Sequence, residues 1–238
     1  MLYIYSGDVP VFDAAVRQAL GARHTLTVIP VSPQERCSAH YTLEHLRQLG
    51  LHARLPGSRY YRDRQRLRNI IMNSDAIYLM GGNTFDYLAY ARQIGLFDII
   101  AAFEDAGGLV LSESAGSIIL SPTIVTALIP TTCPDEQLIE LPDYRGMGRI
   151  PFHVSPHFDP GARVAARELD ELQVLASMTH CPVWVLQDGE GLVVDGDRVI
   201  DMAGQPLRLD PETVDDGGRA QDYIQLIPDW AIPRAVVA

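Results

Sequence analysis

A serine at a predicted strand-to-helix turn is the feature of this sequence most able to do chemistry. The apolar run 109–111 leads into the segment 112–116, which reads Ser-Glu-Ser-Ala-Gly. Such a turn lifts a serine hydroxyl clear of a sheet, and small neighbours let other backbone approach it. Ser114 is therefore a candidate nucleophile, the alternative being an ordinary helix N-cap. Ser112 stands where the common G-x-S-x-G form has a glycine, so we expect its Cβ to crowd the turn.

A pair of glycines follows a second apolar run. Residues 76–80 read as a buried strand, and Gly81 and Gly82 come directly after it, before a helical stretch. Backbone N–H groups at such a position point at a ligand and favour negative charge. An oxyanion hole needs donors of this kind.

Two histidines lie where a strand is expected to end. His153 and His157 belong to the strand-like run 152–158, whereas His24, His40, His45 and His52 are expected to be solvated or satisfied. His157 is 157 − 114 = 43 residues from Ser114. Only the fold could bring the two together.

Three motifs occur in order along the chain: Gly-Gly-Asn-Thr-Phe at 81–85, Ser-Ala-Gly at 114–116 and Pro-His-Phe at 156–158. Together they resemble the serine peptidases typified by dipeptidase E and cyanophycinase, over most of the chain from Ile77 to about Val194. The resemblance implies a fold similar to the class I glutamine amidotransferase domain.

Carried over to this sequence, the resemblance makes Ser114 the nucleophile and His157 the general base and later the acid. The backbone N–H groups of Gly82 and Ala115 become the oxyanion donors. The chemistry agrees, because a hydroxyl is a poor nucleophile until a base removes its proton, and the tetrahedral intermediate needs donors aimed at its oxygen.

The third member of the triad departs from the dipeptidase pattern. Dipeptidase E carries an aspartate after the nucleophile helix, but the matching segment 122–130 has no carboxylate. Cyanophycinase-like relatives use a glutamate after the histidine, and Asp188 aligns with it, with Glu190 two residues away. Asp-Gly-Glu-Gly is equally good chemistry for a plain turn. Glu113, expected to be exposed in the elbow, is the remaining candidate.

Substrate contacts are predicted at three positions. Arg163 falls where the family has a substrate-binding arginine, in a segment, 159–169, that we expect to begin a helix. A guanidinium there would clamp a carboxylate with two parallel hydrogen bonds, although the residue could simply decorate a solvated helix face. Asn83 and Thr84 are further candidates.

Composition limits the alternatives. The chain has 238 residues, 47% of them hydrophobic, and no apolar run of 18 residues. We expect one soluble domain over 1–238, with short strands and turns in 195–238. Three scattered cysteines favour a reducing compartment, hence a cytoplasmic location, and show no metal-ligand spacing.

The charged residues exclude several kinds of chemistry. All 19 basic residues are arginine, so Schiff-base, Walker-type and Ser-Lys chemistry are excluded. The net charge of −11 argues against a general nucleic-acid surface. An arginine cluster at 59–68 is interleaved with apolar residues, as expected of a helix with one wet face.

Strands alternate with helical segments through the first half of the chain. Residues 2–5 and 25–31 read as strands, and 11–20, 42–49 and 98–105 as helices. This pattern predicts an α/β fold with a doubly wound, mainly parallel sheet and helices on both faces. Ligands of such folds bind at the carboxyl ends of the strands, where both glycine motifs lie. The segment 131–148 is predicted to be a long loop bordering the site.

The sequence thus predicts a cytoplasmic serine exopeptidase that hydrolyses short, Asp-containing peptides through an acyl-enzyme. We expect no metal or other cofactor and no nucleic-acid or membrane partner, and the resemblance implies a homodimer. One alternative is a carboxylesterase-type acyl hydrolase. Another is a catalytically inactive peptide-binding homologue, for which Ser112 and the absent aspartate after the elbow would be the signs.

Overall fold

A seven-stranded sheet forms the centre of the computed structural model. The structure describes residues 1–7, 17, 20–21, 25–32, 36–48, 50–57, 62–129 and 135–212. Within these, the strand order is β3-β2-β4-β5-β1-β8-β9. The strands from β3 to β1 are parallel, and β8 and β9 are antiparallel additions at one edge. The strands are β1 (Leu2–Tyr5), β2 (Thr25–Ile29), β3 (His52–Arg54), β4 (Ala76–Leu79), β5 (Leu109–Glu113), β8 (Gly191–Asp195) and β9 (Arg198–Ala203).

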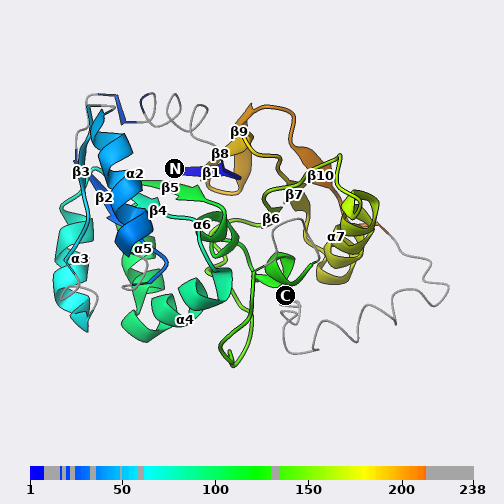
Figure 1. Cartoon of the computed structure of the whole chain (residues 1–238), viewed down its shortest axis with the longest axis horizontal. Coiled ribbons are helices and arrows are strands. Elements are labelled where there is room, and N and C mark those ends of the chain that lie inside the picture. Colours follow the sequence, from blue (N-terminus) through cyan, green and yellow to red (C-terminus); the bar gives the residue numbers. More distant parts are fainter. Residues whose placement is uncertain are drawn as a thin grey trace.

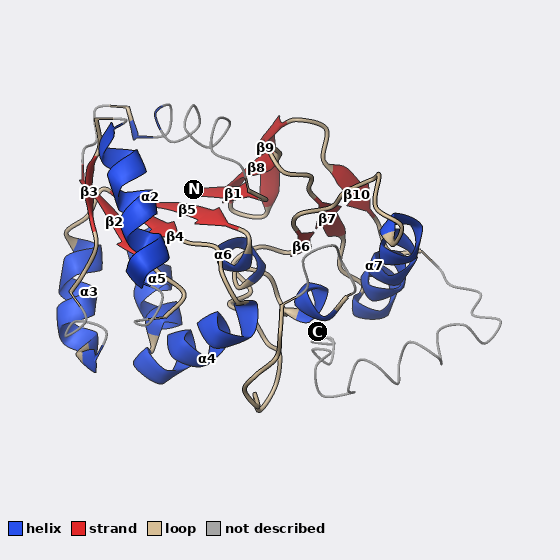
Figure 2. Cartoon of the chain, in the orientation of Figure 1, coloured by secondary structure: helices blue, strands red, loops and turns tan. Residues whose placement is uncertain are grey.

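Helices cover both faces of this sheet (Figures 1 and 2). Side chains alternate across each strand, so Ile77 and Leu79 of β4 belong to one apolar cluster while Tyr78 belongs to another. The first cluster lies under α3 (Arg64–Met72), α4 (Thr84–Ile94) and α5 (Leu96–Asp105), and the second under α2 (Arg36–Gln48). The predicted doubly wound, mainly parallel fold is confirmed.

A second, smaller sheet lies beside the first and was not anticipated from the sequence. It contains β6 (His153–Ser155), β7 (Val183–Val185) and β10 (Leu207–Leu209), in the order β10-β7-β6. Helix α7 (Ala165–Thr179) packs against β7 and β10 (Figure 1). The chain passes from one sheet to the other through α6 (Ala115–Ile118) and the short 3-10 helix η2 (Val125–Leu128).

Several element boundaries differ from the predicted ones. In the segment 159–169, helix α7 begins only at Ala165. The residues before it form turns, in which Asp159 Oδ1 accepts a hydrogen bond from Gly161 N–H (2.8 Å). Strand β2 ends at Ile29, and the helical stretches 42–48 and 98–105 are parts of longer helices, residue 49 lying outside the described residues. Most of the predicted helix 11–20 and all of 213–238 lie outside the described residues.

The arginine cluster forms the wet face of α3, as predicted, in the part of it that the structure describes. Arg64 pairs with Asp98 (2.6 Å) and Arg66 with Asp63 (2.9 Å), whereas Leu67 on the same helix is fully buried. No helix in the described ranges combines the length and the apolar character that a membrane span requires.

Candidate active site

Ser114 occupies a tight turn between β5 and α6. Its backbone has φ 50° and ψ −117°, a region that residues with a Cβ rarely adopt. The turn is held to the neighbouring strand, because Ser114 N donates to Tyr5 O (3.0 Å). It also packs tightly on β4: a Cβ at Gly116 would lie 2.3 Å from Leu79 O. The local geometry is therefore that of a nucleophile elbow.

Ser112 does not crowd this turn, and the expectation that it would is wrong. Its side chain is fully buried, and its hydroxyl donates to Tyr3 O (3.2 Å). Ser112 Oγ also lies 3.0 Å from Ser117 Oγ, which donates to Tyr5 O (3.0 Å). The two hydroxyls thus fasten β5 and α6 to β1, a role that a glycine at position 112 could not perform.

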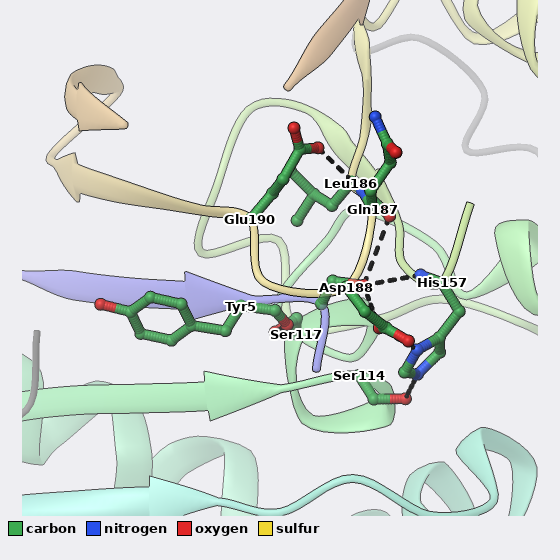
Figure 3. A network of polar contacts seen from close by, with 9 residues as sticks. Tyr5, Ser114, Ser117, His157, Leu186, Gln187, Asp188 and Glu190 are labelled. Carbon is green, nitrogen blue, oxygen red and sulfur yellow. Dashed lines mark hydrogen bonds and ion pairs between the residues drawn. The ribbon is translucent and has the colours of Figure 1, made fainter. Parts of the chain in front are cut away.

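The structure brings Ser114, His157 and Asp188 together (Figure 3). His157 Nε2 lies 2.8 Å from Ser114 Oγ, and His157 Nδ1 lies 2.7 Å from Asp188 Oδ1. A carboxylate at Nδ1 accepts the proton carried there, which leaves the Nε2 lone pair facing the serine hydroxyl. The imidazole is oriented as a base toward Ser114 requires.

The three side chains come from both sheets. Ser114 follows β5 of the main sheet, and His157 follows β6 of the small sheet. Asp188 lies between β7 of the small sheet and β8 of the main sheet. The junction between the two sheets is therefore what assembles the site.

The two other candidate carboxylates have different partners. Glu190 is buried and accepts backbone hydrogen bonds from Gln187 N (2.8 Å) and Gln205 N (2.9 Å). Glu113 bonds to the Tyr78 hydroxyl and is half-buried rather than exposed as expected. Burial raises the pKa of Glu113; His157 lowers it by less, and Asp188 adds a smaller rise. The carboxylate at the His157 ring is that of Asp188.

His153, the other strand-end histidine, is fully buried at the start of β6. Burial lowers its pKa to about 4, so its ring stays neutral at physiological pH. It lies inside the protein, whereas the half-buried His157 faces Ser114.

The two predicted oxyanion donors are the N–H groups of Ala115, which directly follows Ser114, and of Gly82, which follows Gly81 after β4. Ala115 N–H belongs to the first turn of α6, where N–H groups have no intrahelical acceptor. Gly82 is exposed and has φ 142°, which favours glycine. Its neighbour Gly81 approaches the nucleophile so closely that a Cβ there would lie 3.1 Å from Ser114 Cβ.

Asn83 and Thr84, predicted to contact substrate, are engaged within the protein. Asn83 is the N-cap of α4: its Oδ1 accepts from Asp86 N (3.0 Å) and its Nδ2 donates to Glu136 O (2.8 Å). Thr84 N donates to Asp135 Oδ2 (2.8 Å). Thr84 is fully buried, and its contact with a substrate stays a prediction.

The loop predicted at 131–148 is described from residue 135 onward. These contacts place it against the N-terminus of α4, whose first residue, Thr84, is two residues after Gly82. Farther along, hydrogen bonds from Arg145 hold the pKa of Asp143 far below its usual range, and Arg92 also bonds to this carboxylate. Asp143 therefore anchors the loop to α4.

Arg163 lies in the turn before α7, six residues after His157. Its side chain is exposed, and no residue in the described ranges forms a hydrogen bond or ion pair with it. The guanidinium is thus available to an outside partner.

Ser6 is a site residue that the sequence reasoning missed. It follows β1, and its Oγ lies 2.6 Å from His157 N and 3.1 Å from Asp188 Oδ1. A lone serine after the first strand gives no signal in the sequence. Across the described ranges, no three His, Cys, Asp or Glu side chains gather in a way that could hold a metal ion.

An α/β sheet that presents a Ser-His-Asp array of this geometry defines the serine hydrolase class. The model of peptidase family S51 matches residues 9–202, and the chain belongs to this family.

Three relatives illustrate the similarity. The chain is 28% identical to a Peptidase E of Streptomyces coelicolor over 53% of this chain and 51% of that protein. It is 31% identical to a Peptidase E of Shewanella amazonensis over 56% of this chain and 55% of that protein. The chain thus spans about half the length of these curated relatives. The crystal structure of a candidate Peptidase E protein from Listeria monocytogenes superimposes with a TM-score of 0.65 and 21% identity, over 87% of this chain and 98% of that one, which shows a shared fold.

Proposed function

We propose that this protein is a serine peptidase that cleaves short peptides through an acyl-enzyme. The observation that carries the proposal is the pair of contacts at His157, 2.8 Å to Ser114 Oγ and 2.7 Å to Asp188 Oδ1. Membership of peptidase family S51 and similarity to Peptidase E proteins support it.

The reaction follows from the positions of these atoms. Ser114 Oγ attacks the scissile carbonyl carbon while His157 Nε2 takes the hydroxyl proton. Asp188 stabilises the resulting imidazolium through Nδ1–H. His157 then returns the proton to the leaving amine, which departs and leaves an ester on Ser114. A water molecule, deprotonated by the same imidazole, hydrolyses the ester and restores the serine.

The negative charge of each tetrahedral intermediate falls on the former carbonyl oxygen. The N–H groups of Gly82 and Ala115 are the donors for it, because Ala115 directly follows Ser114 and Gly82 directly follows Gly81, which closely approaches Ser114. Removing one such donor costs about 3 kcal/mol of barrier in serine hydrolases.

The preferred substrates are short peptides that contain aspartate, cleaved from one end. Arg163 is exposed and lies near His157 in the sequence, so it can bind a substrate carboxylate. Long-range repulsion by the net charge of −11 is screened beyond about 8 Å at physiological salt. The loop from residue 135 borders the Gly82 side of the site and suits a short substrate.

The protein is further proposed to act as a homodimer in the cytoplasm, without a nucleic-acid partner. The dimer rests on the family resemblance alone. Light scattering at micromolar concentration should give the mass of two chains, and a mass of one chain would contradict it.

The decisive experiment is intact-protein mass spectrometry after exposure to a serine-directed fluorophosphonate. The parent protein should gain one adduct, and Ser114→Ala and His157→Ala should gain none. Cleavage of α- and β-aspartyl dipeptides then tests the peptidase assignment. Rapid hydrolysis of short acyl esters without peptide cleavage would instead favour a carboxylesterase, and a folded parent protein that gains no adduct would favour an inactive binding homologue.

A further inference from the structure

The Ser6 hydroxyl lies at the centre of the contacts that join His157 to Asp188. Ser6 is fully buried, and its Oγ lies 2.6 Å from His157 N, 3.1 Å from Asp188 Oδ1 and 3.3 Å from Leu186 O. Ser6 extends β1 of the main sheet, whereas Leu186 and His157 follow strands of the small sheet. One hydroxyl thus contacts both sides of the junction on which the site is built.

The hydrogen-bonding capacity of a serine fits these contacts. A hydroxyl carries one proton and two lone pairs. Ser6 Oγ accepts from His157 N–H and donates its proton to Asp188 Oδ1 or to Leu186 O. Asp188 Oδ1 is also the oxygen that bonds to His157 Nδ1.

We propose that Ser6 is a positioning residue for the reaction, acting through His157 and Asp188. This inference rests on the proposed serine peptidase function. Among the described residues, Ser6 forms no hydrogen bond with Ser114; it fixes the backbone of the base and the side chain of the acid relative to each other.

His157 needs such support because of its backbone. Its φ is +62°, in the left-handed region that residues with a Cβ rarely occupy unless their surroundings hold them there. The bond from His157 N–H to Ser6 Oγ supplies one such restraint, and the bond from Phe158 N to Leu186 O (2.9 Å) supplies the next.

Asp188 needs support because it is exposed. The side chain of Asp188 is 58% accessible, so water competes for its oxygens and its rotamer is weakly restrained by packing. A buried donor on Oδ1 holds that oxygen toward the imidazole. Gly7, the next residue, packs closely against both side chains: a Cβ at this position would lie 2.9 Å from Asp188 Oδ1 and 3.0 Å from His157 Cε1.

The end of β1 therefore contacts every member of the triad. Tyr5 O accepts from Ser114 N (3.0 Å), Ser6 bonds to His157 and Asp188, and Gly7 O accepts from Gly189 N (2.7 Å) beside Asp188. Two adjacent residues at the end of β1, Tyr5 and Ser6, therefore hold the Ser114 turn and His157.

The test compares Ser6→Ala with Ser177→Ala. Ser177 is a matched control, because it is a buried serine on α7 that also donates to a carbonyl, Gln173 O (3.0 Å), and accepts from a backbone N–H, that of Glu212 (3.2 Å). We expect Ser6→Ala to lower kcat and the fluorophosphonate labelling rate together by about 10- to 100-fold, the factor that corresponds to one hydrogen bond to a charged group. KM should stay within about 3-fold of the parent value, and Ser177→Ala should keep the parent kcat.

A double-substitution cycle separates positioning from general destabilisation. If Ser6 acts through Asp188, Ser6→Ala in an Asp188→Ala background should lower kcat by much less than it does in the parent. Equal losses in the two backgrounds would overturn the part of the proposal in which Ser6 acts through Asp188. Ser6→Cys, which fills the same space with a weaker hydrogen-bonding group, should show a loss in the same direction even where Ser6→Ala fails to fold.

The two inferences fail in different ways. A parent protein that labels at Ser114 while Ser6→Ala and Ser6→Cys label at the parent rate would overturn the role of Ser6 alone. A folded parent that neither labels nor hydrolyses any substrate would overturn the proposed function and, with it, the role of Ser6.

Discussion

Asp188 Oδ1 lies 2.7 Å from His157 Nδ1, although the Asp188 side chain is 58% exposed. The carboxylate that contacts the His157 ring therefore lies at the surface, where packing holds it less firmly than it would a buried carboxylate. Its placement depends on hydrogen bonds, which makes the surrounding turn and strand ends important for activity.

Asp188→Asn should lower kcat by as much as about 10⁴-fold, because an amide NH₂ facing Nδ1 favours the wrong imidazole tautomer. The KM for a good substrate should change little, since Asp188 is not placed to bind it. Steady-state kinetics on an aspartyl dipeptide check this. A variant with the parent kcat would show that another group orients His157.

Glu190→Ala should lower the stability of the protein more than its activity. The side chain is buried and accepts from Gln187 N and Gln205 N, so its removal leaves two backbone donors without acceptors. Each lost hydrogen bond to a charged group costs about 1.5–3 kcal/mol of unfolding free energy. Denaturant unfolding measures this loss, and a kcat loss as large as that of Asp188→Asn would contradict the structural role.

Glu168→Gln should change how stability depends on pH. Glu168 is 1% exposed, and burial, with a smaller effect from Glu171, raises its pKa from 4.5 to about 7. The folded state then binds more protons than the unfolded state between these values, so this group's contribution to the free energy of unfolding falls as pH rises from about 4.5 to about 7.

Urea unfolding of the parent and of Glu168→Gln across that range should show the stability difference shifting in favour of the variant as pH rises. A difference that does not vary with pH would contradict the raised pKa.

Arg163→Ala should raise KM strongly for acidic peptides and leave neutral peptides nearly unaffected. The guanidinium is exposed, and in the proposed function it binds a substrate carboxylate, which neutral substrates lack. Kinetics on an Asp-containing dipeptide and a neutral analogue make the comparison, with Arg167→Ala as a control, because Arg167 bonds to Glu171 (2.6 Å) on α7. Equal effects of Arg163→Ala on both substrates would remove it from the specificity site.

Much of the main sheet could be predicted from the chain alone. The apolar runs at β4 and β5, each followed by small residues, identify buried parallel strands whose carboxyl ends carry the glycine motif and Ser114. These are local signals, because strand alternation and turn chemistry involve residues close together in sequence. The small sheet was not predicted, because its strands are only three residues long and their pairing joins segments far apart in the chain.

The sequence by itself determined the nucleophile turn and the residue types of the site, since a Ser-Ala-Gly turn after an apolar strand is a local pattern. Tertiary structure alone decided which carboxylate meets His157. Asp188 and Glu190 are two residues apart in the turn before β8, and Gly189 N between them is bonded to Gly7 O after β1. In the fold, Asp188 lies at the imidazole, whereas Glu190 is buried against backbone N–H groups. Tertiary structure also decided the contacts of Ser6, which lies 151 residues from His157 in the sequence and meets it where the two sheets adjoin. Contacts over such distances depend on how packed layers align, and no local pattern encodes that.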